Sequence, residues 1–179
     1  YDPVKDFAPV SMVATNPNIV VVHSSVAANS IRELIALAKR KAGSVAFSTS
    51  VIGSPNYVGA ELLASMSGAE FNVIVYKGIT QALQEVVSGE SQLVISSIQA
   101  AVPLIKAGRL KALAVTQAKR SRFVPEVPTV AESGYPGFEA GTWFAFFGPA
   151  GIPREIVTKL AAGIAAVSHL PDVRERMLA

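Results

Sequence analysis

Residues 18–116 alternate between short apolar segments and longer amphipathic ones, and this alternation limits the possible folds more than any other feature of the chain. The apolar segments have the length of strands and occupy residues 18–23, 45–47, 71–76, 92–96 and 110–116. The segments between them carry apolar residues at helical spacing. This β-α-β-α-β-α-β-α-β order predicts a parallel sheet with helices on both faces. The sequence therefore predicts an α/β fold.

Residues typical of helix ends support the four expected helices. Ser30 and Glu33 form the pattern of a capping box before the first helix, which we expect to end at Gly43. The second helix is expected to begin at Pro55 and to stop at Gly68. Two further helices are expected, one capped by Thr80 and one over residues 100–107.

The remainder of the chain differs in composition and suggests a second lobe, with a boundary near residue 120. A strand is predicted over residues 7–15, and prolines interrupt the region after residue 124. Thr129 and Glu132 predict a second capping box on a short helix that Gly134 ends. A strand over residues 142–147 and helices over 153–167 and 172–178 complete the expected elements.

Charge and composition exclude several classes of protein. Half of the 179 residues are hydrophobic, but no apolar run approaches the ~18 residues of a membrane-spanning helix. The net charge is +3 and the basic residues are scattered, so no nucleic-acid partner is predicted. The chain has no cysteine, which excludes disulfides and thiolate metal sites.

Residues for catalysis are scarce, and we predict that the chain is not an enzyme. His23 and His169 stand alone at the ends of expected elements, where solvated or structural roles are typical. No cluster with metal-ligand spacing, no nucleophile motif and no nucleotide-binding glycine motif is present. The sequence therefore predicts no catalytic residue, no metal site and no cofactor.

Small polar residues follow three of the expected strands, where ligands bind in open α/β sheets. The stretch "FSTSVIGSPNYVGAELL" at residues 47–63 places hydroxyls and a glycine before a helix. A helix N-terminus of this kind can bind a carboxylate or phosphate, but the same residues also suit simple helix capping. On the residues alone both readings remain open. The candidate contacts are Ser48, Thr49, Ser50, Gly53, Ser54, Tyr76, Lys77, Gly78 and Ser96.

Several stretches, in order along almost the whole chain, resemble one known family. They are "YDPVKDFAPVS" at 1–11, "YKG" at 76–78, "AGRLKALAVTQAKRS" at 107–121 and "VPEVPTVAESGYPGFEAGTWFAFFGPAGIP" at 124–153. The chain resembles the Bug-type extracytoplasmic solute receptors of tripartite tricarboxylate transporters.

The resemblance implies a two-lobe architecture of the periplasmic-binding-protein (type II) kind, closing on a small ligand. It implies a complete lobe two over residues 24–115, hinge strands at 18–23 and 110–116, and an incomplete lobe one from residues 1–17 and 122–179. Family chains are longer, so we expect this chain to be truncated at both ends, with a signal peptide upstream and a periplasmic location.

The resemblance also implies what the receptor binds. The loop matching residues 48–54 and the following helix N-terminus would help to hold a ligand carboxylate, and the loop matching Tyr76 to Gly78 would contribute to the cleft. The ligand would be a dicarboxylate, a tricarboxylate, an amino acid or an aromatic acid. The closed form would be recognised by membrane transporter subunits.

The chain departs from the family pattern at the candidate site. Val51 and Ile52 make the first loop bulkier and more apolar, and Tyr57 stands where a histidine is usual. Val75 replaces the usual proline before "YKG", and Gln92 and Ser96 stand where acidic residues are common. Fewer acids would favour anionic ligands, and Val51 with Ile52 would admit an aromatic or apolar ligand body.

Two other functions compete with the receptor. The ligand-sensing domain of a LysR-type transcription regulator shares the two-lobe architecture, and it would carry a helix-turn-helix upstream. A hydrolase using a loop serine is the other alternative, although no His or Lys base lies at a recognisable spacing. An incomplete lobe one would also expose apolar strands, including residues 143–147, and predicts self-association of the chain.

Overall fold

The computed structural model describes residues 1–178, and these divide into two compact units. Unit 2 comprises Asn16–Thr142, and unit 1 comprises Tyr1–Thr15 together with the chain from Trp143 onward. Every buried hydrophobic side chain identified in the structure lies in unit 2.

Unit 2 is built on a five-stranded sheet with the order β4-β3-β5-β2-β6. The strands are β2 (Asn18–His23), β3 (Ala46–Thr49), β4 (Asn72–Val75), β5 (Leu93–Ser97) and β6 (Leu110–Val115). Four helices connect them: α1 (Ile31–Arg40), α2 (Pro55–Ser67), α3 (Ile79–Ser88) and α4 (Ile98–Lys106). The predicted alternation of strands and helices is confirmed.

The prediction of an all-parallel sheet is wrong for one strand. β3 pairs in parallel with β4 and β5, but β2 runs antiparallel to both of its neighbours, β5 and β6. A strand–helix pattern gives the order of elements along the chain, but it does not show that β2 lies between β5 and β6 or in which direction it runs there. Because β2 is antiparallel to β5, its amino end lies at the same end of the sheet as the carboxyl ends of β3 and β5.

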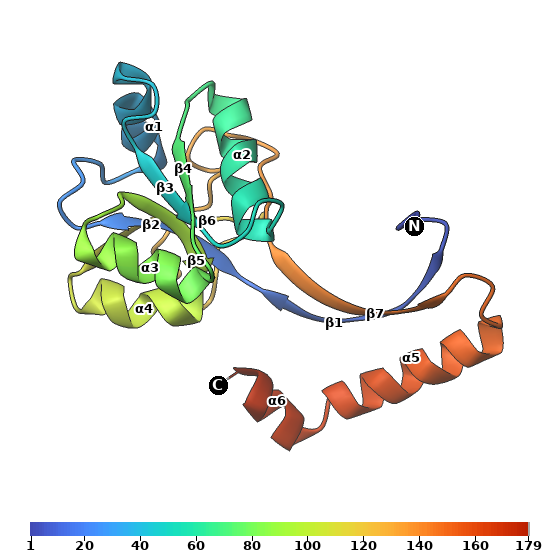
Figure 1. Cartoon of the computed structure of the whole chain (residues 1–179). Coiled ribbons are helices and arrows are strands. Elements are labelled where there is room, and N and C mark those ends of the chain that lie inside the picture. The colour runs from blue at the N-terminus through green and yellow to red at the C-terminus, as the bar shows by residue number, and fades with distance from the viewer. Residues whose placement is uncertain (179) are drawn as a thin grey trace. The chain divides into compact units, whose positions relative to one another are not determined.

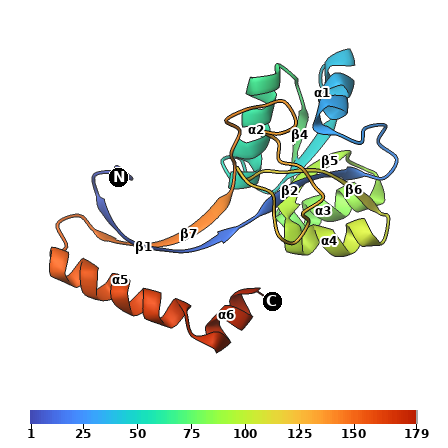
Figure 2. The same ribbon diagram turned by 180° about the vertical axis from the view of Figure 1, so that it is seen from behind.

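Helices cover both faces of this sheet, as Figure 1 and the reverse view in Figure 2 show. The face carrying Phe47 packs against α1 and α2, with Leu34 and Leu63 in the same core cluster. The face carrying Val94 packs against α3 and α4, with Val86 and Ile98 in a second cluster. The apolar segments that form β2, β3 and β5 correspond to strands buried on both sides, whereas no residue of the edge strand β4 is buried.

Residues 122–142 pack with unit 2, although the sequence assigned them to lobe one. Val124 and Val127 belong to the core cluster beside α3 and α4, and Val130 and Phe138 to the cluster beside α1 and α2. This segment contributes to the cores on both faces of the sheet. The boundary suggested by composition, near residue 120, therefore differs from the boundary defined by packing, after Thr142. The lobe assignment itself stays a prediction.

Three local predictions about helices are corrected. The Thr129–Glu132 capping box forms, with both reciprocal hydrogen bonds at 2.8 and 3.0 Å, but the segment is a series of turns rather than a helix. Thr80 does not cap α3; the N-cap is Gly78, one residue before Ile79. α4 begins at Ile98, two residues earlier than predicted, because the Ser97 hydroxyl caps it.

Unit 1 contains a two-stranded sheet of β1 (Phe7–Asn16) and β7 (Thr142–Pro149), whose end residues Asn16 and Thr142 belong to unit 2. It also contains α5 (Arg154–Ser168) and α6 (Pro171–Leu178). None of its residues in 1–15 and 143–177 is buried. Unit 1 thus presents apolar side chains without a core of its own.

Candidate functional site

A pocket of about 390 Å³ lies in unit 2, where the carboxyl ends of β3 and β5 meet the amino end of β2. The strand ends supply hydroxyl and amide groups to its wall, and the first turns of three helices supply the rest. Its lining residues are Asn16, Asn18, Ser50, Ser54, Pro55, Asn56, Ile79, Thr80, Leu83, Ser96, Ser97, Ala100 and Thr142. No charged side chain is among them.

The N-termini of α2, α3 and α4 all reach this pocket, through Pro55, Ile79 and Ala100 respectively. The free N–H groups of a helix N-terminus carry partial positive charge. Three such ends around one pocket make it favourable for an anion even without a lysine or arginine.

The three helix ends differ in how they are capped. The Ser54 hydroxyl accepts a hydrogen bond from Tyr57 N at 3.3 Å, and the Ser97 hydroxyl accepts one from Ala100 N at 3.3 Å. α3 has no side-chain cap, because its N-cap is Gly78. The first-turn N–H groups of α3 therefore have no side-chain acceptor, and this end of the pocket is the best suited to an anionic group.

Asparagine side chains organise one wall of the pocket. Asn56 Nδ2 donates to the carbonyl oxygen of Ile95 at 2.8 Å, which ties the first turn of α2 to β5. Asn18 Nδ2 donates to Asn56 Oδ1 at 3.4 Å and to Thr142 Oγ1 at 3.2 Å. Sequence analysis missed Asn18, Asn56 and Thr142, since lone amides and hydroxyls in strands or helices carry no motif.

Three of the nine predicted contact residues line the pocket: Ser50, Ser54 and Ser96. Ser48 and Thr49 do not lie in the loop as expected but end β3, where their backbones pair with β4. Both are fully buried, and neither hydroxyl has a hydrogen-bond partner among the described residues. They lie directly before the pocket residue Ser50.

The other four predicted contacts, Gly53, Tyr76, Lys77 and Gly78, are not among the lining residues. Gly53 has a φ of +85° and forms the turn before Ser54, a conformation that glycine adopts without strain. Tyr76 N donates to the Thr49 carbonyl at 2.8 Å, which holds the Tyr76–Gly78 loop beside β3. Their role as ligand contacts stays a prediction.

Val51 and Ile52 remain exposed at 58% and 69% in the loop between the pocket residues Ser50 and Ser54. Neither belongs to a core cluster, so no packing role in unit 2 accounts for them. Their effect on ligand choice likewise stays a prediction.

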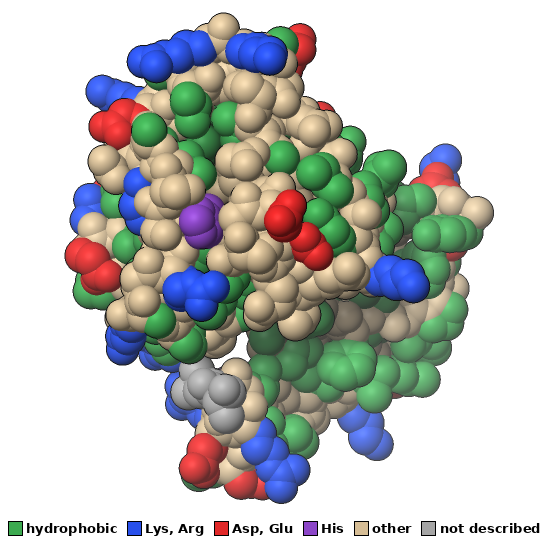
Figure 3. Space-filling view, turned by 60° about the vertical axis from the view of Figure 1, so that its left-hand side comes forward, with side chains coloured by type: hydrophobic (Ala, Val, Ile, Leu, Met, Phe, Trp, Pro, Cys, Tyr) green, Lys and Arg blue, Asp and Glu red, His purple; other side chains and the backbone are tan. Residues whose placement is uncertain are grey.

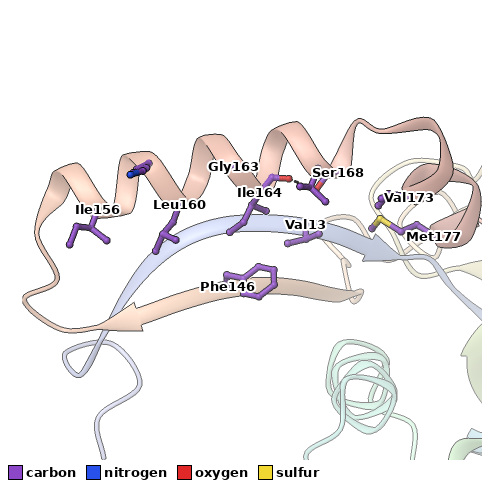
Figure 4. A pocket seen from close by; sticks show the side chains of 11 residues that line it. Val13, Phe146, Ile156, Leu160, Gly163, Ile164, Ser168, Val173 and Met177 are labelled. Carbon is purple, nitrogen blue, oxygen red and sulfur yellow. Dashed lines mark hydrogen bonds between the residues drawn. The ribbon is translucent and has the colours of Figure 1, made fainter.

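A second cavity of about 550 Å³ lies within unit 1 and has a different character. Figure 4 shows Ile156, Leu160 and Ile164 of α5 facing Phe146 of β7 and Val13 of β1. The Ser168 hydroxyl donates to the Ile164 carbonyl at 2.8 Å. This groove is apolar and offers little for recognising a polar ligand.

The described residues contain no cluster of metal-ligating side chains, and the face shown in Figure 3 carries no continuous basic patch. Among residues 1–178 no group of three His, Cys, Asp or Glu side chains could hold a metal ion. On the face shown in Figure 3, Lys and Arg side chains lie in short, separated groups.

No single helix in the described part of the chain is long and apolar enough to cross a membrane. The pair α5 and α6 passes that test only when taken together, by length and composition, and it is bent by 79°.

Comparison with known proteins assigns the family. Residues 1–179 match the profile described as tripartite tricarboxylate transporter family receptor. The chain belongs to this family. The resemblance inferred from the sequence is thereby confirmed, and because the family is one of receptors, the prediction that the chain is not an enzyme agrees with it.

Relatives of the family are similar over nearly the whole chain. BugT of Bordetella pertussis is 37% identical over 160 residues, which are 89% of this chain and 49% of that protein. The chain spans about half the length of the curated relatives it matches.

Solved structures confirm the predicted α/β periplasmic-binding-protein-like class. Rpa4515 of R. palustris with adipate superposes with a TM-score of 0.80 at 36% identity, over 97% of this chain and 58% of that one. MatC of Rhodopseudomonas palustris with bound malate gives 0.82 at 30%, over 98% and 60%. The periplasmic binding protein BugD gives 0.81 at 30%, over 99% and 59%.

Proposed function

We propose that this chain contributes the ligand-capturing lobe of a periplasmic receptor that binds a small carboxylate for a tripartite transporter. The observation that carries this proposal is the meeting of three helix N-termini at one pocket that no charged side chain lines. Such a pocket stabilises a negative charge and offers no acidic group to a cation. Its volume of about 390 Å³ suits a small molecule.

The neighbours support a carboxylate ligand. Two similar structures, Rpa4515 with adipate and MatC with bound malate, each involve a dicarboxylate. In this chain an amino acid would bring an ammonium group for which the pocket offers no carboxylate. Among the ligand classes implied by the resemblance, the lining therefore favours acids without an ammonium group.

The two-lobe mechanism is part of the same proposal. Residues 24–115 would form lobe two, residues 18–23 and 110–116 the hinge strands, and residues 1–17 with 122–179 part of lobe one. Ligand binding would close the lobes, and membrane transporter subunits would recognise the closed form in the periplasm. The family match favours this receptor over a LysR-type regulator, because its profile describes a transporter receptor.

Isothermal titration calorimetry on the chain with adipate, malate and adipamide tests the ligand class. Adipamide matches adipate in length but carries no charge. We expect saturable binding of at least one diacid at a ratio of one to one, and none of adipamide. Equal binding of adipate and adipamide would contradict anion recognition, and no binding of any acid would contradict the proposed function.

Self-association of the chain is a further part of the proposal, and the surface of unit 1 supports it. Trp143, Phe144, Phe146 and Phe147 of β7 are each about half exposed, between 48% and 58%. Exposed aromatic strands recruit partners, and a second copy of the chain offers the same surface. Sedimentation velocity should show a dimer or larger species that Phe144→Ser with Phe146→Ser weakens; a monomer at every concentration would refute this.

A further inference from the structure

The Asn18 side chain lies in the wall of the pocket at the ends of β2, β3 and β5, which we call the sheet-edge pocket. It also lies beside both junctions between the units: the first junction is Thr15–Asn16, and the second is Thr142–Trp143. Asn18 is only 3% exposed and lies two residues after the start of unit 2 at Asn16. Its Nδ2 donates to Thr142 Oγ1, and Thr142 is the last residue of unit 2. The same Nδ2 donates to Asn56 Oδ1 in the first turn of α2.

The Ile95 carbonyl fixes which atoms donate and which accept in these hydrogen bonds. The Ile95 carbonyl can only accept, so the Asn56 amide must turn its Nδ2 towards it. Asn56 Oδ1 then faces Asn18 and accepts a hydrogen bond, which among the described residues Asn18 Nδ2 alone donates. Both hydrogens of that amide are therefore used, one for α2 and one for the second junction.

The backbone around Asn18 ties the first junction to the same edge of the sheet. The Asn18 carbonyl accepts hydrogen bonds from Thr116 N at 3.0 Å and from Thr116 Oγ1 at 3.3 Å. The Pro17 carbonyl accepts one from Ile98 N, in the first turn of α4, at 3.0 Å. The chain entering unit 2 is thus bonded to elements that also form the pocket.

We propose that Asn18 is a positioning residue that couples occupancy of the pocket to the two chain segments leading into unit 1. Asn18, Asn56 and Thr142 all line the pocket, so a ligand that orders the first turn of α2 also orders both junctions through one buried amide. The inference rests on the proposed function, since it requires a ligand in this pocket. It adds a named route from the ligand to the junctions.

Hydrogen exchange measured by mass spectrometry tests this coupling in the full chain, with adipate and malate as probes. In the unaltered protein, ligand should slow exchange in residues 54–60 beside the pocket and in the junction segments 14–22 and 138–146. Thr142→Val keeps the side-chain shape but cannot accept from Asn18. At acid concentrations that protect 54–60 as fully as in the unaltered protein, this variant should lose the ligand-dependent protection of 138–146.

Two comparisons separate coupling from a structural role. Thr158→Val makes the same change on α5, where the hydroxyl donates to the Arg154 carbonyl at 3.0 Å, and should leave ligand protection unchanged. Asn18→Leu removes both donated bonds without adding a charge to the pocket wall, and it should abolish ligand protection at both junctions while protection of 54–60 persists at saturating acid. A merely structural role would raise exchange equally with and without ligand.

The possible outcomes are distinct. If Thr142→Val retains full ligand protection of 138–146, or if the unaltered protein shows protection at 54–60 alone, the coupling through Asn18 is refuted. If neither acid binds or protects any segment of the unaltered protein, the proposed function fails and the coupling falls with it.

Discussion

Asn56 Nδ2 lies 2.8 Å from the carbonyl oxygen of Ile95, and this bond holds the first turn of α2 against β5 at the mouth of the pocket. Pro55, the residue before it, has no N–H to offer, and Ser54 uses its hydroxyl to cap the helix. The polar groups at the α2 end are therefore already hydrogen-bonded, and the uncapped end of α3 is the part of the pocket left open for a charged group.

Asn56→Asp should weaken carboxylate binding sharply. The change replaces the amide that donates to the Ile95 carbonyl with a carboxylate, so it removes that bond and places a negative charge in the wall of a pocket proposed to hold an anion. Two like charges about 4 Å apart repel by about 4 kcal/mol near a protein surface. A loss of only a third of this energy from the binding free energy would raise Kd about tenfold. Calorimetry with adipate measures the effect. The matched control is Asn72→Asp, at the amino end of the edge strand β4 and not among the residues that line the pocket. Equal losses of adipate affinity in both variants would argue against an anion in this pocket.

Thr49→Val should raise the stability of the ligand-free chain by about 1 kcal/mol, because it removes a buried hydroxyl that has no hydrogen-bond partner within residues 1–178. Urea unfolding measures the change. Thr116→Val provides the opposite case, since the Thr116 hydroxyl donates to the Asn18 carbonyl and its loss should destabilise the chain. Destabilisation of similar size in both variants would show that the Thr49 hydroxyl has a partner that stabilises the fold.

Residues 16–142 alone should fold cooperatively. All of the buried hydrophobic residues identified, and the entire sheet-edge pocket, belong to this part of the chain. Thermal unfolding followed by circular dichroism should show a single sharp transition for the fragment. A shorter fragment that ends at residue 121 loses Val124, Val127, Val130 and Phe138 and should not fold. Cooperative folding of the shorter fragment would contradict the unit boundary.

Glu132→Gln should remove a pH-dependent contribution to stability. The backbone N–H of Thr129 and the guanidinium of Arg120 lower the pKa of the Glu132 carboxyl. Because the folded-state pKa is depressed, this stabilisation is complete above the unfolded value of about 4.3 and is lost as pH falls through the folded pKa. Melting temperatures of the two proteins should differ at pH 7 and converge at pH 2.5. A constant gap, or the same behaviour in Glu126→Gln, would contradict this origin.

The sequence predicted most elements because their signals are local. Ser30, Pro55 and Gly68 mark helix ends through their own backbone and side-chain chemistry, and each occupies the predicted position. The direction of β2 could not be predicted, because it depends on which strands flank it in the sheet. The Thr129–Glu132 turns show that a capping box can form without a helix to follow it.

Part of the candidate site could be predicted because it, too, depends on local signals. Ser50, Ser54 and Ser96 follow or end strands, and that position alone brings them to the ligand-binding edge. Asn18 enters the site only because β2 runs antiparallel, and Thr142 only because a distant segment returns to it. Long-range contacts of this kind leave no pattern along the chain.

The most direct test of the central claim is the mapping of adipate and malate onto the isotope-labelled chain by amide chemical-shift perturbation in two-dimensional NMR spectra. Carboxylate binding at the helix ends predicts that the largest shifts fall on the amides of Ile79 and Thr80, with smaller ones at Ser50, Asn56 and Ser97. Largest shifts in residues 143–178, or no shifts at saturating concentrations of either acid, would contradict the claim that this pocket is the carboxylate site.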